Sequence, residues 1–253
     1  MITDLTGEFD GRKEIFVQIQ YNNRAVRFFA PNWLTHYRAH TMFSKEPETV
    51  AWLGEMGPRD VLLDIGANIG SYTIWAAGIQ GCKVVAVEPE SRNFAILQTN
   101  VFCNGLQEKV TAFCAAAGDY DGIGTLFVNG LLAGNSSHEL NYAVDAALTP
   151  KDMPLRQGIM AVQVDTLLAN AEIPFPTRIK IDVDGFEHQV VDGMQKTLTD
   201  ESVSSVLIEL DPTLPPHAAL IDRFTDLGFA YDPAQVEASY PGNPHANYIF
   251  RRV

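Results

Sequence analysis

Cysteine is scarce in this chain of 253 residues, and every apolar run is interrupted well before it could span a bilayer. The cysteines at positions 82, 103 and 114 are odd in number and show no CxxC spacing, which predicts free thiols in a reducing compartment. The first ten residues lack the basic and apolar segments of a secretory signal peptide. We therefore expect a cytoplasmic protein without a membrane-spanning segment.

Basic residues are also few compared with acidic ones. The chain has 18 lysine and arginine residues against 31 aspartate and glutamate residues, which gives a formal net charge of −13. Such a surface repels phosphate backbones and anionic membranes, so we expect neither a nucleic acid nor a membrane as partner. A small neutral or cationic substrate fits this charge more easily, although the charge could equally serve solubility alone. The sequence does not indicate an oligomeric state.

What the chain does contain is an alternation of apolar strands and amphipathic helices, which predicts an α/β fold with a largely parallel sheet covered on both faces. We expect strands at 61–65, 83–88, 110–115, 178–183 and 203–210, and helices at 71–78, 91–104, 186–198 and 216–227. Two short strands, 229–231 and 246–251, should close the chain as an antiparallel hairpin. This hairpin favours a Rossmann-like seven-stranded sheet of the methyltransferase type over a dehydrogenase sheet.

Two regions stand apart from this alternation. Residues 1–45 are expected to form an N-terminal extension, with a β-hairpin at 14–20 and 24–29, ahead of a main domain that starts with a helix at 46–56. Between strand-like segments at 124–129 and 160–164 lies a polar stretch. A structureless segment as long as 129–160 is usually either functional or disordered. We expect it to act as a substrate lid, which would carry His138, Glu139 and Tyr142.

The sharpest local signal is the segment VLLDIGANIG at 61–70, a strand followed by a glycine turn and a helix. Gly66 and Gly70 let the backbone approach a ligand closely, and Asn68 tolerates positive φ. A dinucleotide GxGxxG pattern would need glycine at 66, 68 and 71, and only the first position has it.

Two acids at neighbouring strand ends specify the ligand further. Asp64 would repel a pyrophosphate but attract the ammonium and sulfonium groups of S-adenosylmethionine. Glu88 ends the next strand, where an acid typically binds ribose hydroxyls. The alternative is that both acids merely cap the helices that follow them. The predicted cofactor residues are Asp64, Gly66, Ala67, Asn68, Ile69, Gly70, Ser71, Tyr72, Glu88, Pro89, Ala116 and Asp182.

With these motifs the chain resembles the FkbM family of S-adenosylmethionine-dependent methyltransferases. The matching segments are KEPET (45–49), DIGANIG (64–70), EP (88–89), Asn100, NG (104–105), VDTLL (164–168), KIDVDG (180–185) and IE (208–209). The resemblance implies a seven-stranded methyltransferase sheet, S-adenosylmethionine as cofactor and, usually, O-methylation of sugar, polysaccharide or polyketide hydroxyls. The chain departs from the family pattern at Asp184, where glutamate is usual, and at Val164, where leucine is common.

The segment KIDVDG is where we expect the chemistry. Lys180, Asp182 and Asp184 alternate and should share one strand face, with Glu209 on the neighbouring strand end. An ion pair with Asp182 is the simplest explanation for a lysine inside a buried strand. Asp182, Asp184 and Glu209 are the candidate catalytic carboxylates, because methyl transfer needs the acceptor's proton removed. His188 is a second candidate base or, equally, a surface helix histidine.

The same three carboxylates could instead hold Mg²⁺, as in catechol-type methyltransferases, but we favour proton removal without a metal. His36 and His40 have the spacing of two ligands on one helix face, yet no acid follows them in the pattern of zinc proteases, so we do not expect them to bind metal.

The sequence therefore predicts an S-adenosylmethionine-dependent methyltransferase that acts on a hydroxyl of a sugar, glycan or small metabolite. The alternatives are an NAD-dependent oxidoreductase and a non-catalytic S-adenosylmethionine-binding interaction protein.

Overall fold

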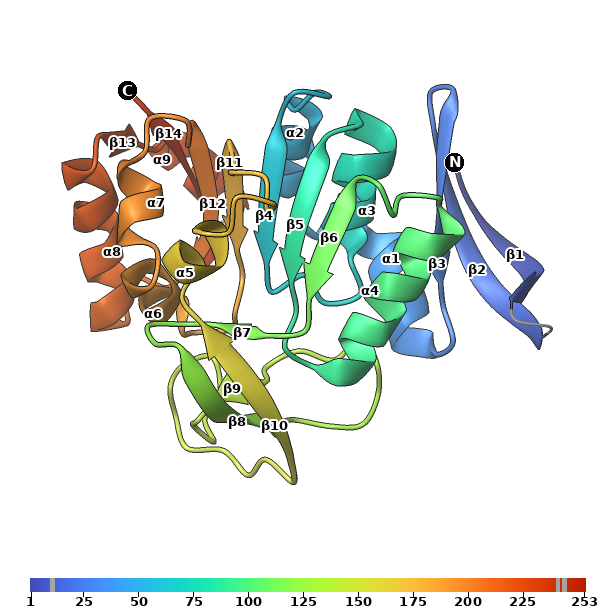
Figure 1. Ribbon diagram of the computed structural model, residues 1–253, viewed down its shortest axis with the longest axis horizontal. Coiled ribbons are helices and arrows are strands. Elements are labelled where there is room, and N and C mark those ends of the chain that lie inside the picture. The colour runs from blue at the N-terminus through green and yellow to red at the C-terminus, as the bar shows by residue number, and fades with distance from the viewer. Residues whose placement is uncertain (10–11, 240–241, 243–244) are drawn as a thin grey trace.

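The computed structural model describes residues 1–9, 12–239, 242 and 245–253 (Figure 1). Its centre is a sheet of seven strands in the order β13-β14-β12-β11-β4-β5-β6. These strands are β4 Val61–Ile65, β5 Lys83–Val87, β6 Val110–Phe113, β11 Arg178–Ile181, β12 Ser205–Leu210, β13 Phe229–Ala230 and β14 Ala246–Arg252. The strands pair in parallel except β14, which is antiparallel to both β12 and β13. The predicted seven-stranded α/β sheet with a C-terminal antiparallel hairpin is confirmed.

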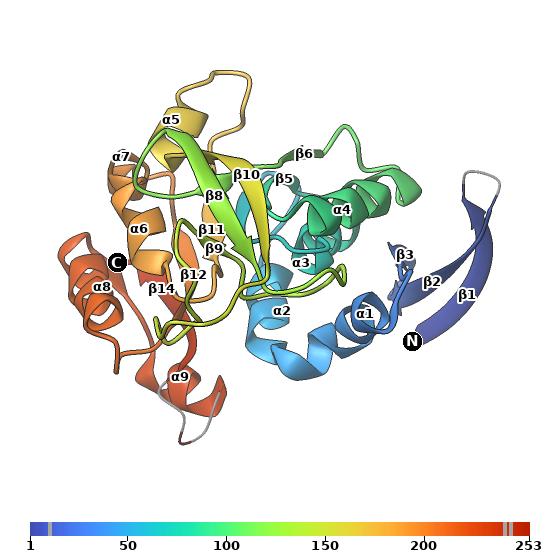
Figure 2. The ribbon, with the colours of Figure 1, turned by 90° about the horizontal axis from the view of Figure 1, so that it is seen from below.

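Helices cover both faces of this sheet, as the apolar strands require. One face carries α2 Pro47–Gly54, α3 Ser71–Trp75, the π-helical turn η1 Ala76–Gln80 and α4 Ser91–Cys103; the other carries α5 Val164–Leu168, α6 Glu187–Asp192, α7 Gln195–Thr199 and α8 Pro215–Asp226 (Figure 2). Strand residues alternate between the two cores, with Leu62 in the first and Leu63 and Ile65 in the second. A further helix, α9 Pro233–Ser239, precedes β14.

The helix predicted at 186–198 is wrong, because the chain forms α6 and α7 with a break at Gly193 and Met194. A Cβ atom on Gly193 would lie 1.9 Å from the carbonyl oxygen of Gly118, so this point packs directly against backbone. The carboxylate of Asp165 then accepts hydrogen bonds from the amides of Lys196 and Thr197, both at 2.9 Å. These bonds satisfy the amides at the start of α7 and favour a new helix over a continuous one.

The N-terminal residues form more structure than the predicted hairpin. Strands β1 Ile2–Phe9, β2 Arg12–Tyr21 and β3 Arg24–Phe29 make an antiparallel sheet, and α1 Trp33–Lys45 follows. Asn32 caps α1 by accepting hydrogen bonds from the amides of Leu34 and Thr35. Side chains of β2, β3 and α1, among them Phe28 and Ala39, belong to the same core as Trp52 and Leu62. The extension is therefore packed onto the face that α2, α3 and α4 cover.

The insertion after β6 forms a second small sheet in the order β7-β10-β8-β9. Its strands are β7 Ala116–Ala117, β8 Gly122–Val128, β9 Glu139–Leu140 and β10 Leu155–Val162. The predicted loop 129–160 therefore contains β9 and most of β10. The strand predicted to begin at residue 160 begins at Leu155 in the structure. This sheet lies below the central sheet in Figure 1, on the side where β6 ends. No helix in the described part of the chain has the length and apolar character needed to cross a membrane.

Candidate active site

The glycine turn after β4 packs tightly against the residue that follows β11. Gly66, Asn68 and Gly70 all have positive φ, at 78°, 52° and 82°. A Cβ atom on Gly66 would lie 1.8 Å from the carbonyl oxygen of Asp182, and one on Gly70 would lie 2.3 Å from a methyl carbon of Leu97. At Gly66 a side chain would collide with backbone, so glycine there lets the turn bring the end of β4 against Asp182; at Gly70 a side chain would require Leu97 to shift.

A cleft opens at the carboxyl edge of the sheet beside this turn, where open α/β sheets bind ligands. Its main cavity, of about 260 Å³, lies between α1 and the ends of β4 and β11. Two smaller cavities, of about 50 and 40 Å³, also touch Gly66; the first lies beside Glu88 and the second beside Ala116 and Glu139. The predicted cofactor residues that line these cavities are Gly66, Ala67, Asn68, Ser71, Tyr72, Glu88, Pro89, Ala116 and Asp182.

The remaining predicted cofactor residues, Asp64, Ile69 and Gly70, do not line the cleft. Asp64 is only 1% exposed. The hydroxyl of Thr73 donates to its Oδ2 at 2.5 Å, while Oδ1 has no hydrogen-bond partner among the described residues. Burial raises the pKa of Asp64, and the nearby Lys180 ammonium opposes this effect. Asp64 therefore does not line the cleft, and it affects the cleft through its electrostatic interaction with Lys180.

Glu88 holds the glycine turn to the start of α4. Its Oε2 accepts a hydrogen bond from the amide of Asn68 at 2.7 Å, and its Oε1 accepts one from the amide of Glu90 at 2.9 Å. Burial raises the pKa of Glu88 to about 7. The N-cap of α4 is Glu90, and the N-cap of α3 is Gly70, which offers no side chain. Neither Asp64 nor Glu88 is therefore the N-cap residue of the helix that follows it.

A segment of the insertion lies over the Glu88 cavity. The carbonyl of Asn135 accepts hydrogen bonds from the side-chain amides of Asn68 and Asn93, at 2.9 and 3.0 Å. The carbonyl of Gly134 accepts one from Arg38 of α1. Its attachments to both α1 and α4 suit a lid, and the lid role stays a prediction. Of the other predicted lid residues, His138 and Glu139 line the cleft and Tyr142 stacks on Phe186.

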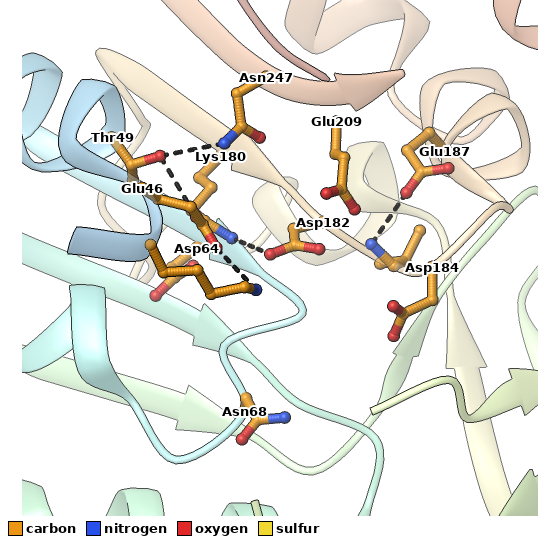
Figure 3. Close-up of polar contacts among 12 residues, drawn as sticks. Glu46, Thr49, Asp64, Asn68, Lys180, Asp182, Asp184, Glu187, Glu209 and Asn247 are labelled. Atoms are coloured by element: carbon orange, nitrogen blue, oxygen red, sulfur yellow. Dashed lines mark hydrogen bonds and ion pairs between the residues drawn. The ribbon is translucent and has the colours of Figure 1, made fainter. Parts of the chain in front are cut away.

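Asp182, Asp184 and Glu209 come together at the ends of β11 and β12 (Figure 3). An oxygen of each lies within 4.8 Å of the others. β11 ends at Ile181, and Asp184 has a φ of 58°, so the expected alternation fails after Asp182. The carboxylate of Asp184 instead accepts a hydrogen bond from the amide of Ser137 at 2.7 Å. The cluster forms, but Asp184 reaches it from a turn and not from a strand face.

The charges around Asp182 are arranged to keep it ionised. The Lys180 ammonium lies 2.8 Å from its Oδ2, which confirms the predicted ion pair. Burial alone would raise the pKa of Asp182, but Lys180 holds it below its usual range. Lys180 is 1% exposed, and although burial opposes its charge, the carboxylates of Asp182 and Asp64 hold its pKa above the usual range.

The two flanking carboxyl groups behave in the opposite way. Burial and the charge of Asp182 raise the pKa of both Asp184 and Glu209. Glu209 lies 3.3 Å from Nε2 of His245, and this contact raises the pKa of His245 to about 9. Asp182 is thus the member of the cluster best able to stay deprotonated at neutral pH.

His188 is not brought to the cleft. It lies on α6, where its ring stacks on Phe186 with centroids 5.9 Å apart, and it lines none of the three cavities. Its Nδ1 is buried without a hydrogen-bond partner in the described part of the chain. Burial lowers the pKa of His188, which favours the neutral ring.

Several residues that line the cleft were not predicted as cofactor or catalytic residues, although Glu139 was placed in the expected lid. Arg38 and Lys45 of α1, with the adjoining Glu46, form one wall of the main cavity. Glu139 of β9 is 1% exposed, lines the small cavity beside Ala116, and its Oε1 has no hydrogen-bond partner among the described residues. The KEPET segment was a usable signal for Lys45 and Glu46. Arg38 and Glu139 stand in no motif.

Glu139 makes the stability of the protein depend on pH. Burial raises its pKa from 4.5 to about 10, so folding favours the neutral acid, and this stabilisation is lost as pH rises above about 4.5. We expect Glu139→Gln to increase the free energy of unfolding by roughly 2–4 kcal/mol at pH 8 and by little at pH 4.5. Urea denaturation at the two pH values measures this. The exposed Glu108→Gln is the control, and an equal effect of Glu139→Gln at both pH values would contradict the prediction.

Comparison with known proteins agrees with this geometry. A family model described as the methyltransferase FkbM domain matches residues 64–231. The chain belongs to this family. The hexuronic acid methyltransferase AglP of Haloferax volcanii is 27% identical over 193 residues, which covers 76% of this chain and 73% of AglP.

Solved structures with a similar fold share little sequence with this member of the FkbM family. TYW2 of Pyrococcus horikoshii, in complex with MeSAdo, has a TM-score of 0.46 and 14% identity, with 94% of this chain and 74% of TYW2 covered. The precorrin-6y C5,15-methyltransferase of Geobacter metallireducens has a TM-score of 0.45 and 14% identity, with 74% and 71% covered. The family match establishes a methyltransferase domain and not an NAD-dependent oxidoreductase.

Proposed function

We propose that this protein transfers the methyl group of S-adenosylmethionine to a hydroxyl of an acidic sugar. The observation that carries the proposal is the position of Asp182. Its carboxylate lies beside the glycine turn, lines both the main cavity and the Glu88 cavity, and is held ionised by Lys180. A hydroxyl acceptor needs such a proton acceptor at the reacting centre.

The cleft suits the adenosine half of the cofactor. Glu88 offers a buried carboxylate at the strand end where ribose hydroxyls are usually bound. The cavity beside Ala116 has apolar walls, with Pro89 and Leu126 among them. Glu139 also lines it, and its Oε1 has no hydrogen-bond partner among the described residues. An adenine ring has an apolar face and an amino group that could donate to this oxygen. Glu139 therefore suits the adenine end and Glu88 the ribose.

The main cavity suits the methionine half, which is zwitterionic beyond the sulfonium. The carboxylates of Glu46 and Asp182 and the ammonium of Lys45 line it. When bound, S-adenosylmethionine supplies an activated methyl group. The chain's own task is then to align the acceptor and remove its proton. We assign the role of proton acceptor to Asp182. The charges that set the pKa of Asp182 come from Lys180, Asp184 and Glu209.

A metal ion is not needed for this assignment. Each of the three clustered carboxylates already has a partner, namely Lys180 for Asp182, the Ser137 amide for Asp184 and His245 for Glu209. We favour proton removal without Mg²⁺, as the sequence suggested.

Arg38 points to an acidic acceptor. Lys45 and Lys180 are paired with Glu46 and Asp182, whereas Arg38 donates a hydrogen bond to the carbonyl of Gly134. The cleft therefore offers a guanidinium group that no carboxylate of the described residues pairs with, although the protein as a whole carries a charge of −13. A uronic acid supplies a carboxylate, which agrees with the hexuronic acid named for AglP.

The test compares two acceptors that differ only in this carboxylate. With S-adenosylmethionine, a glucuronide should give S-adenosylhomocysteine with a kcat/KM at least about tenfold above that of the matching glucoside, since a charged hydrogen bond contributes about 1.5–3 kcal/mol. Arg38→Met should abolish this difference without weakening S-adenosylhomocysteine binding. If the variant instead weakens S-adenosylhomocysteine but not 5′-methylthioadenosine, Arg38 binds the cofactor's carboxylate and the acidic acceptor is contradicted.

A binding measurement, combined with this turnover assay, tests the non-catalytic alternative. S-adenosylhomocysteine should raise the melting temperature, whereas NAD should not. Binding of S-adenosylhomocysteine with no turnover on any sugar hydroxyl would favour an interaction protein and contradict the proposed activity.

A further inference from the structure

A second polar cluster lies outside the cleft, between the first strand and the first helix. Nε2 of His36 lies 3.1 Å from both carboxylate oxygens of Asp4, and Nε2 of His40 lies 2.8 Å from Oδ1 of the same residue. The two imidazoles stack with centroids 4.2 Å apart. They stand one turn apart on α1, so both rings leave the same face of the helix. Two imidazoles and one carboxylate thus converge on one point.

Two sides of this triangle have lengths close to those of a zinc site. Zn–N and Zn–O bonds of about 2.0–2.1 Å at tetrahedral angles place two ligand atoms about 3.3 Å apart. The observed separations between the imidazole nitrogens and the Asp4 oxygens are 2.8 and 3.1 Å. All three donor groups lie within 4.8 Å of one another. Around an ion, the two distances from the imidazole nitrogens to Asp4 would lengthen by a few tenths of an ångström.

The chemistry of the ligands also suits a first-row transition metal. Neutral imidazole and carboxylate are the ligands that Zn²⁺ takes in three-residue sites, where water completes the coordination. The side chains are reachable, since 38% of His36, 31% of His40 and 54% of Asp4 is exposed. The other cluster of metal-ligand type among the described residues, Asp182, Asp184 and Glu209, contains only carboxylates and has Lys180 beside it. It is the poorer zinc site of the two.

We propose that Asp4, His36 and His40 bind a divalent transition metal, with Zn²⁺ as the probe, and that the ion fastens β1 to α1. The site could not be predicted from the sequence, because Asp4 precedes the histidines by 32 residues or more. Asp4 also lies in β1, a strand that was not predicted. Arg38 and Lys45 lie on the opposite side of α1 from the two histidines and line the cleft. The metal would therefore stiffen one wall of the cleft without taking part in the reaction.

Equilibrium dialysis of the full chain, without a histidine tag, against Zn²⁺ tests the site. The wild type should bind one Zn²⁺ here, and Asp4→Asn and His40→Gln should each weaken binding at least about tenfold, because loss of even an outer-shell partner of a metal site costs 10–100-fold. Both substitutions keep a hydrogen-bonding side chain, so the fold should survive. The control is Asp192→Asn, which makes the same chemical change at an exposed pair with Arg223 and should bind Zn²⁺ like the wild type.

A second measurement separates the site from other zinc-binding groups. Zn²⁺ should raise the melting temperature of the wild type and of Asp192→Asn, and should leave those of Asp4→Asn and His40→Gln unchanged. Absence of Zn²⁺ binding by the wild type overturns the proposal. So does binding that persists at full affinity in both variants, because the ion then lies elsewhere, for example at the cysteines or at Asp182.

Discussion

Asp182→Asn is expected to lower kcat for methyl transfer by roughly 10²–10⁴-fold. The amide has the shape of the carboxylate and its oxygen can still accept the hydrogen bond from Lys180, which now spans 2.8 Å. It cannot take a proton from the acceptor hydroxyl. Because the amide has the size of the carboxylate and the side chains of Glu88 and Glu139 stay in place, the affinity for S-adenosylhomocysteine should fall much less than kcat. Steady-state kinetics and a binding titration measure the two quantities separately.

Lys180→Met provides the companion measurement. Lys180 holds the pKa of Asp182 below its usual range, so its removal should raise that pKa and move the acidic limb of the kcat/KM profile to higher pH.

Turnover of the wild type should not depend on added Mg²⁺. A kcat of Asp182→Asn close to that of the wild type would refute the assignment of the proton acceptor, and a Mg²⁺ requirement would point to a metal site at the same carboxylates.

Gly66→Ala is expected to be the most disruptive small change in the cleft. The new Cβ would lie 1.8 Å from the carbonyl oxygen of Asp182, and the backbone there has a φ of 78°. Neither the turn nor the chain after β11 can yield without moving backbone. We expect a loss of roughly 2–4 kcal/mol in the free energy of unfolding, from overpacking and left-handed strain together. Activity should fall with it, because the displaced residue is Asp182.

Gly228→Ala is the matched control for this substitution. Gly228 has nearly the same φ, 81°, but a Cβ atom there would meet nothing within 4 Å. Its cost should therefore be the strain alone, about 1 kcal/mol. Urea denaturation of both variants gives the comparison. Equal losses would mean that the contact between Gly66 and Asp182 does not matter for stability.

Much of the cleft could be predicted because parallel strands end at one edge of a sheet. The glycine turn at 66–70, Glu88 and Asp182 each follow a strand whose apolar run is visible in the sequence, and Glu209 lies near the end of another. The structure brings them to that edge. Prediction failed where local geometry departs from the regular pattern. Asp184 takes a left-handed turn and leaves the strand face, and the helix after it breaks at Gly193.

The sequence by itself determined the sheet, the family and the acids at the strand ends, because these depend on periodicity and on short segments that fold locally. Tertiary structure alone decided which distant side chains complete the cleft and the second polar cluster. Arg38 reaches the cleft from α1, Glu139 from the inserted sheet, and Asp4 meets His36 across two elements. Such contacts arise from the packing of whole elements, which no spacing along the chain encodes.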